Sequence, residues 1–319
     1  MKPSTSTTKK QFRSSLLRWL GTVLSIVLLI YLLSKQGWAE IWQAVQHIPP
    51  LYFGIAILLM LGSRLAVAGR WYALLKGADQ NLSIKETIRL VFAGLFATNF
   101  LPTTIGGDVI RLAGAVRRKL DPSITTASLL ADRLVGIAGM TTLLPLGLPY
   151  LLVARGNGMT NEPVQFMAFI GFNAKIRIWF TRGREFIQST LIALLLWTKN
   201  PCSLVKALLW TYGHQVCLFT TIWVLFQGMN QPISWWVVAG LWIFNYYISL
   251  LPISINGLGV QELSIAYIYT QFGGVSTESA LAMAVLIRVL FVIASLPGVI
   301  ALPEIMSSGK SQMPEQRQG

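Results

Sequence analysis

Charged residues are scarce in this sequence. Of its 319 residues, 12% are charged and 54% are hydrophobic, and the mean hydropathy is positive at +0.58. A soluble domain carries about 25% charged residues, and no hydrophilic block here is long enough for a folded catalytic domain. The composition excludes an ordinary soluble protein and predicts an all-α, polytopic membrane helix bundle.

Acidic residues are especially few. Only 12 Asp and Glu accompany 26 Lys and Arg, which gives a formal net charge of +14. Such a balance can indicate nucleic-acid binding, but here the basic residues stand in short clusters between apolar runs. The preference of Lys and Arg for the cytoplasmic side of a membrane explains that pattern better. We therefore expect no nucleic-acid partner.

Residues typical of metal sites and of nucleophilic catalysis are also nearly missing. Cys202 and Cys217 have neither a disulfide framework nor metal-ligand spacing, and His47 and His214 stand alone. The sequence contains no Gly-x-x-x-x-Gly-Lys-Ser/Thr loop for ATP phosphates. We expect no metal site, no cofactor, no catalytic residue and no direct use of ATP.

Six apolar runs predict full transmembrane helices, because each is followed or preceded by a basic or polar segment. The first is not followed by a small-x-small cleavage site, so we interpret it as a helix and not as a signal peptide. The second contains Arg64, which either snorkels to the interface or contributes to binding. The runs cover residues 19–33, 51–75, 125–153, 162–180, 204–227 and 280–302.

Residues 88–117 predict a re-entrant helical hairpin, which enters and leaves the membrane by one face. Its first arm has about 14 residues and a length of roughly 21 Å, which is shorter than the roughly 30 Å of a hydrocarbon core. Pro102 and the pair Gly106-Gly107 then break the helix. Basic clusters flank both ends, so both ends are expected on the cytoplasmic side.

Residues 239–272 predict a second hairpin, which is broken at Pro252, Gly257 and Gly259 and flanked by uncharged segments. Three full crossings separate the two hairpins in this layout. An odd number of crossings inverts the second hairpin relative to the first. Inverted repeats with Gly/Pro-interrupted segments at matching positions indicate a transporter site near the membrane midplane.

The two hairpins carry matching charged residues. Asp108 follows the first break and Arg133 lies in the next span, while Glu262 and Arg288 occupy the corresponding positions after the second break. Asp132 and Arg133 are adjacent and lie about 100° apart on a helix, so each should meet a charge on a different segment.

Unwound backbone cannot face lipid, so the two breaks should line a polar cavity, with half-helix N-termini directed at an anion. The arginines would hold a phosphate, and Asp108 and Glu262 would meet a cationic headgroup or a coupling proton. Alternatively, these charged residues only pair with one another and hold the hairpins in place. The candidate substrate-binding residues are Asn99, Gly106, Gly107, Asp108, Arg111, Asp132, Arg133, Ser254, Asn256, Gly257, Gly259, Glu262 and Arg288, with Pro102 and Pro252 as structural breaks.

Four spaced motifs resemble those of a known family. They are Leu-Pro-x-x-x-Gly-Gly-Asp-x-x-Arg at 101–111, Asp-Arg-Leu-x-Gly at 132–136, Leu-Pro-x-Ser-x-x-Gly-x-Gly-x-x-Glu at 251–262, and Arg288 nine residues before Pro297-Gly298. Together they resemble the lysylphosphatidylglycerol synthase transmembrane region, a flippase-like family, over roughly residues 15–305.

In two-domain members of that family, the membrane region moves aminoacylated phosphatidylglycerol between leaflets and a separate soluble domain performs aminoacyl transfer. The resemblance therefore implies the lipid-translocating part without the synthase chemistry, so we do not expect an enzyme. It implies translocation or binding of a phosphate-bearing lipid of the phospholipid, aminoacyl-lipid or polyprenyl-phosphate type. An intramembrane enzyme acting on a lipid phosphate and a secondary transporter of ions or small solutes stay open as alternatives.

The predicted layout is a single transmembrane domain over residues 19–302 in the cytoplasmic (inner) membrane. Polar tails at 1–18 and 303–319 are both expected in the cytoplasm. The expected partners are membrane lipids with an anionic phosphate headgroup. A homo-oligomer or a partner enzyme of lipid synthesis stays open.

Overall fold

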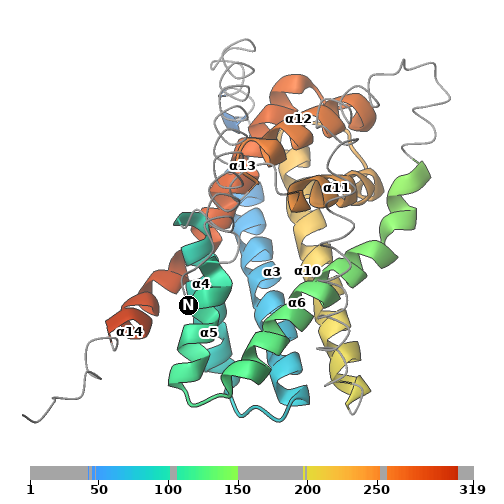
Figure 1. The fold of residues 1–319 in the computed structure, drawn as a ribbon. Helices are drawn as coiled ribbons and strands as arrows, with labels where there is room; N and C mark the ends of the chain where they lie inside the picture. Colours follow the sequence, from blue (N-terminus) through green and yellow to red (C-terminus); the bar gives the residue numbers. More distant parts are fainter. Residues whose placement is uncertain are drawn as a thin grey trace, which may run out of the picture.

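A computed structural model describes residues 48–100, 106–149, 200–251 and 257–307, together with the isolated residues 42, 45, 46 and 197. Every regular element in these ranges is helical, which confirms the all-α prediction for the described part of the chain (Figure 1). The predictions that lie outside the described residues are the spans 19–33 and 162–180, the breaks Pro102 and Pro252, and the candidate residues Ser254 and Asn256.

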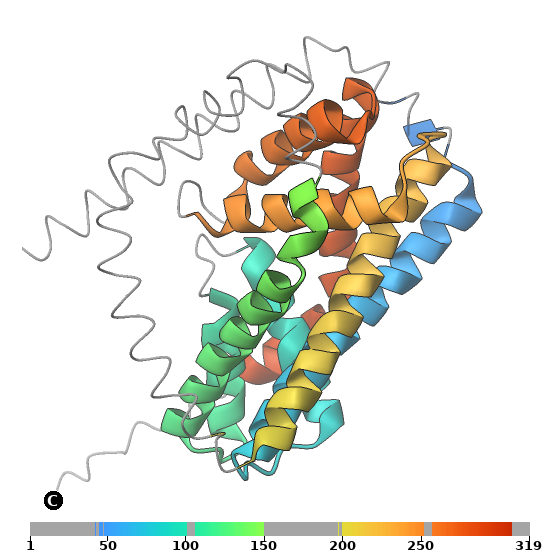
Figure 2. The same cartoon turned by 90° about the vertical axis from the view of Figure 1, so that its right-hand side faces the viewer.

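Helices α3 (Pro50–Gly77) and α10 (Pro201–Gly228) form an antiparallel pair that runs the length of the molecule (Figure 2). Glycines allow the close approach: a Cβ atom at Gly69 would lie 2.6 Å from the ring of Trp210. A Cβ atom at Gly77 would likewise lie 2.5 Å from Ser203. Because later residues of α3 meet earlier residues of α10, the two helices are antiparallel.

Only two helices among the described residues combine the length and the apolar composition needed to cross a bilayer, namely residues 50–77 and 277–300. Large apolar side chains cover the outward face of α3, where Leu51 and Leu58 are each 69% exposed. Leu209 of α10 is 63% exposed. Such apolar exposure fits contact with lipid. The predicted number of six crossings stays a prediction.

The first predicted hairpin corresponds to α4 (Ile84–Phe100) and α5 (Gly106–Arg117), which are packed together. Helix α4 begins four residues before the predicted arm, because Ser83 and Glu86 form a capping box. At the same end, Arg118 Nε donates to Glu86 Oε1 over 3.1 Å and joins the two arms. A Cβ atom at Gly107 would lie 2.5 Å from the carbonyl oxygen of Gly94, so the arms touch backbone to backbone near the break.

Helix α6 (Pro122–Thr142) follows the first hairpin. Asp121 caps its N-terminus by accepting from the backbone nitrogen of Ile124 over 2.9 Å. The helix ends at Thr142, and the chain is helical again over residues 144–149 after a turn at Leu143. This interruption lies next to Pro145, and proline commonly ends or bends a helix.

The second hairpin corresponds to α11 (Trp235–Leu250) and α12 (Val260–Gly273). The two arms are joined by a hydrogen bond from Tyr269 Oη to the carbonyl oxygen of Val238 over 3.0 Å and by one between Ser264 and Asn245. The chain then continues through α13 (Thr277–Ser295), the 3-10 helix η2 (Leu296–Ile300) and α14 (Leu302–Ser307). Helix α14 begins the segment that was expected as a polar tail, and its Ile305 is buried.

The two hairpins open toward opposite ends of the α3–α10 pair (Figures 1 and 2). At one end, the backbone nitrogen of Asp121 donates to Gln80 Oε1 over 3.2 Å, beside the open end of the first hairpin. At the other end, the backbone nitrogen of Ser276 donates to Gln231 Oε1 over 3.3 Å, beside the open end of the second. Because α3 is about 42 Å long at 1.5 Å per residue, these ends are far apart. The interrupted ends of both hairpins therefore point toward the middle.

Candidate functional site

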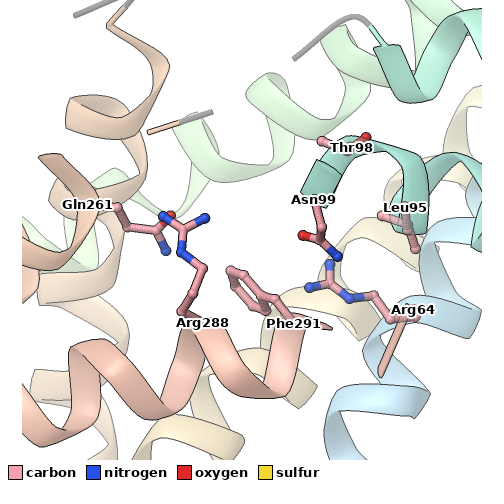
Figure 3. Close-up of a pocket in the computed structure, with 7 residues that line it drawn as sticks. All are labelled: Arg64, Leu95, Thr98, Asn99, Gln261, Arg288 and Phe291. Atoms are coloured by element: carbon pink, nitrogen blue, oxygen red, sulfur yellow. The ribbon is translucent and has the colours of Figure 1, made fainter. Parts of the chain in front are cut away.

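A cavity of about 170 Å³ lies where the two hairpins approach each other (Figure 3). Arg288 and Gln261 lie on one side of it, Arg64 and Asn99 lie on the other, and the ring of Phe291 stands between them. Helices from both halves of the chain supply the lining residues, which are Arg64 from α3, Leu95, Thr98 and Asn99 from α4, Gln261 from α12, and Arg288 and Phe291 from α13.

The cavity lies near the midpoints of the two long apolar helices, residues 50–77 and 277–300. Arg64 is near the centre of α3, so that about 20 Å of helix extends on each side of it. Arg288 is similarly central in the apolar helix formed by residues 277–300. Charged side chains at this depth of a hydrocarbon core are unfavourable by about 2.5–3.5 kcal/mol each on insertion scales and usually mark a functional site.

Glu262 fixes the start of α12 and the position of Arg288. One carboxylate oxygen, Oε2, accepts from the backbone nitrogen of Gly259 over 2.7 Å, and the other, Oε1, accepts from Arg288 Nε over 2.6 Å. Gly257 and Gly259 have φ angles of +69° and +81°, in a region that glycine adopts readily and other residues adopt rarely. The Gly-x-Gly spacing thus permits the turn that brings Glu262 to the helix start.

Asp108 has the corresponding position in the first hairpin, as the third residue of α5. Its Oδ2 accepts from Arg133 Nε over 2.7 Å, and Arg111 Nη1 lies 3.3 Å from its Oδ1. The two pairs differ in exposure. The side chains of Asp108 and Arg133 are 20% and 40% exposed, whereas those of Glu262 and Arg288 are 6% and 22% exposed.

A third acid, Asp132, bridges two arginines. Its Oδ1 accepts from Arg70 Nε over 2.6 Å, and its Oδ2 accepts from Arg111 Nη1 over 3.1 Å. The guanidinium of Arg111 also lies 4.3 Å from the ring centre of the buried Trp71. Asp132 thus pairs with α3 and α5, and Arg133 pairs with Asp108 of α5, so each meets a charge outside its own helix, as their adjacent helical positions predicted.

Gly136, one turn after Asp132, makes room for Arg70. A Cβ atom at Gly136 would lie 2.9 Å from Arg70 Nη1. Packing around the ion pair of Arg70 and Asp132 therefore explains the glycine at the end of the Asp-Arg-Leu-x-Gly motif. The part of Arg70 in this network was not predicted from the sequence. The signal was a basic residue inside an apolar helix, seven residues before its end.

Arg64 differs from these arginines because it has no carboxylate partner among the described residues. Its Nε is closed to solvent and makes no hydrogen bond. Its guanidinium lies 4.5 Å from the ring centre of Phe291, at the wall of the cavity. This position favours the binding alternative over the snorkelling alternative for Arg64.

The structure separates the predicted site residues into groups. Asn99 and Arg288 line the cavity, and Asn99 Nδ2 donates to Ser295 Oγ over 2.8 Å. Asp108, Arg111, Asp132 and Arg133 form an ion-pair network that does not line it. Sequence reasoning missed Gln261, although it immediately precedes Glu262, and Phe291, which lies one helical turn after Arg288.

Comparison with known proteins agrees with an integral membrane protein. A UPF0104 membrane protein of Pyrococcus horikoshii is 26% identical over 138 residues, which make up 42% of this chain and 41% of that protein. This alignment thus covers about two fifths of the relative's length. The lysylphosphatidylglycerol synthase TM region matches residues 18–298, a range that includes both hairpins and all the charged pairs described above. The chain therefore belongs to the lysylphosphatidylglycerol synthase TM region family, a lipid-related family of membrane proteins.

Proposed function

We propose that this protein is a flippase-like transporter that binds the phosphate-bearing headgroup of a lipid between its two hairpins and moves it from one leaflet to the other. The observation that carries this proposal is the cavity near the midpoints of the long apolar helices, where Arg64 and Arg288 lie on opposite sides of Phe291 (Figure 3). Arginine is well suited to phosphate, since its planar guanidinium can donate two parallel hydrogen bonds.

The opposed hairpins support alternating access to this cavity. Each hairpin is interrupted near the cavity and opens toward a different end of the molecule (Figure 1). Movement of one hairpin relative to the α3–α10 pair would open the cavity to one side only. In this proposal, six crossings and two re-entrant hairpins place both tails in the cytoplasm. The open end of the first hairpin then lies at one surface of the inner membrane, and the open end of the second lies at the other.

The size of the cavity supports a route for a headgroup and not for a whole lipid. A cavity of about 150 Å³ accommodates a molecule the size of benzene, and the cavity here is about 170 Å³. The hydrocarbon chains would therefore remain in the bilayer, against exposed apolar side chains such as Leu58 and Leu65.

The ion pairs hold the half-helices that frame the cavity. Glu262 connects the start of α12 to α13 through Arg288, and Asp108 connects the start of α5 to α6 through Arg133. Arg288 both lines the cavity and pairs with Glu262, so its remaining N–H groups can bind a phosphate while Glu262 holds the side chain in place.

Purified protein in lipid vesicles tests the proposal. A labelled phosphatidylglycerol is introduced into one leaflet, and its arrival in the other leaflet is measured together with its chemical identity. The proposal expects unchanged lipid in the far leaflet at a rate well above that of protein-free vesicles. A new lipid species would indicate an enzyme, and solute release without lipid movement would indicate a solute transporter.

A further inference from the structure

The charges in the helices around the cavity are unequal. Within the described helices, four mostly buried arginines, at positions 64, 70, 111 and 288, and the 40% exposed Arg133 stand against the three acids Asp108, Asp132 and Glu262. A buried charge that lacks a counter-ion is strongly unfavourable. The described part of the interior therefore carries an excess of positive charge that a ligand with negative charge would neutralise.

Every carboxylate oxygen of the three acids already accepts a hydrogen bond. Glu262 receives Arg288 on Oε1 and the backbone nitrogen of Gly259 on Oε2. Both oxygens of Asp108 and both oxygens of Asp132 are likewise occupied by arginine side chains. None of the three acids lines the cavity. This arrangement argues against the expectation that Asp108 and Glu262 meet a cationic headgroup.

The excess positive charge is concentrated at Arg64. Its Nε is buried without a hydrogen-bond partner, its guanidinium is placed against Phe291, and no described carboxylate lies within ion-pair distance. The remaining polar side chains of the wall include the amides of Asn99 and Gln261, which can donate to an oxyanion without adding charge. An ammonium group in this cavity would meet two guanidinium groups and no available carboxylate.

The structure assigns to this cavity a lipid headgroup that carries net negative charge and no ammonium group, with Arg64 as its fixed counter-ion. This inference rests on the proposed function for the location of the headgroup, and it deepens that function by naming the substrate class. Phosphatidylglycerol and lipid phosphate monoesters belong to the class. Zwitterionic and aminoacylated lipids are outside it.

Lipid retention by the purified protein tests the inference independently of transport. The protein is solubilised in detergent with an equimolar mixture of phosphatidylglycerol, phosphatidylethanolamine and lysylphosphatidylglycerol of identical acyl chains, and the lipids that remain bound are quantified by mass spectrometry. All three lipids offer the same phosphodiester to the arginines, and repulsion between an ammonium group and the two guanidinium groups corresponds to about tenfold or more in affinity. We therefore expect phosphatidylglycerol to be enriched about tenfold over each of the other two lipids. Equal retention, or enrichment of either ammonium-bearing lipid, would overturn the inference.

Two variants and a competitor sharpen the test. Arg64→Gln should remove the enrichment, Arg64→Lys should keep part of it because the charge remains, and the exposed Arg89→Gln should leave it unchanged. Enrichment that survives Arg64→Gln would overturn the role of Arg64. Excess inorganic phosphate should not displace the lipid, and full displacement would assign the cavity to free phosphate instead. Selective retention without movement between leaflets would contradict the proposed function while leaving the inference intact.

Discussion

Arg288 donates its Nε hydrogen to Oε1 of Glu262 over 2.6 Å, across 26 residues of sequence. The pair of Arg133 and Asp108 repeats this relationship over 2.7 Å and 25 residues. In each case the acid is the third residue of a half-helix, and the arginine lies in the long helix that follows. In both halves of the chain, an ion pair therefore connects the start of a half-helix to the long helix that follows it in the sequence.

Glu262→Gln should abolish lipid movement while the protein stays in the membrane. The substitution removes the negative charge that holds Arg288, and an uncompensated buried charge destabilises by about 3–5 kcal/mol. Lipid movement in vesicles, thermal unfolding and the amount of protein in the membrane fraction measure the effect. Glu278→Gln is the matched control, because Glu278 lies in the first turn of α13, where a single charge contributes only about 0.3–1 kcal/mol. Normal lipid movement by Glu262→Gln would contradict the role of this pair.

Asp132→Asn should be among the most destabilising single substitutions in the first half. Asp132 is 2% exposed and forms ion pairs with both Arg70 and Arg111, so its loss should lower the free energy of unfolding by about 3–5 kcal/mol. Glu86→Gln removes an ion pair whose acid is 38% exposed, and such pairs contribute less than about 1 kcal/mol. Thermal unfolding in detergent compares the two variants, and equal losses would refute the bridging role of Asp132.

Gly107→Ala should weaken the first hairpin. The added Cβ atom would meet the side chain of Thr98 and the backbone of Gly94, so the arms must separate. Such overpacking typically destabilises by about 1–3 kcal/mol. Gly54→Ala is the control, because nothing lies within 4 Å of the added atom, and a helical glycine replaced by alanine gains up to about 1 kcal/mol. Unfolding temperatures that change equally in both variants would show that the α4–α5 contact is unimportant.

The short helices on either side of each predicted break could be foreseen because breaks in apolar runs have local causes. Pro and Gly interrupt a helix wherever they occur, and the arms on either side are visible as short apolar segments. The start of α4 was placed four residues late because the Ser-x-x-Glu capping signal at Ser83 and Glu86 was not used. Element ends therefore depended on side-chain capping, which the apolar pattern does not show.

The site was predicted less completely because its partners come from distant helices. Matched spacing in two copies identified Asp108 and Arg133 as the counterparts of Glu262 and Arg288, and the structure pairs the two members of each set. No matching residue in the other half of the chain points to Arg70 or Gln261. Their roles depend on how α3 and α12 pack against neighbouring helices. Matched spacing also could not show that Arg64 lacks a carboxylate partner among the described residues, whereas Arg111 has two.

The opposed arrangement of the two hairpins is the central claim, and cysteine labelling tests it most directly. Lys119 and Ser276 are exposed, and they lie beside the open ends of the first and second hairpins, respectively. Each is replaced by cysteine in a background that carries Cys202→Ser and Cys217→Ala, and oriented membranes are treated with an impermeant maleimide from either side. The account predicts that Lys119→Cys reacts only from the cytoplasmic side and Ser276→Cys only from the opposite side. Labelling of both from the same side would contradict it.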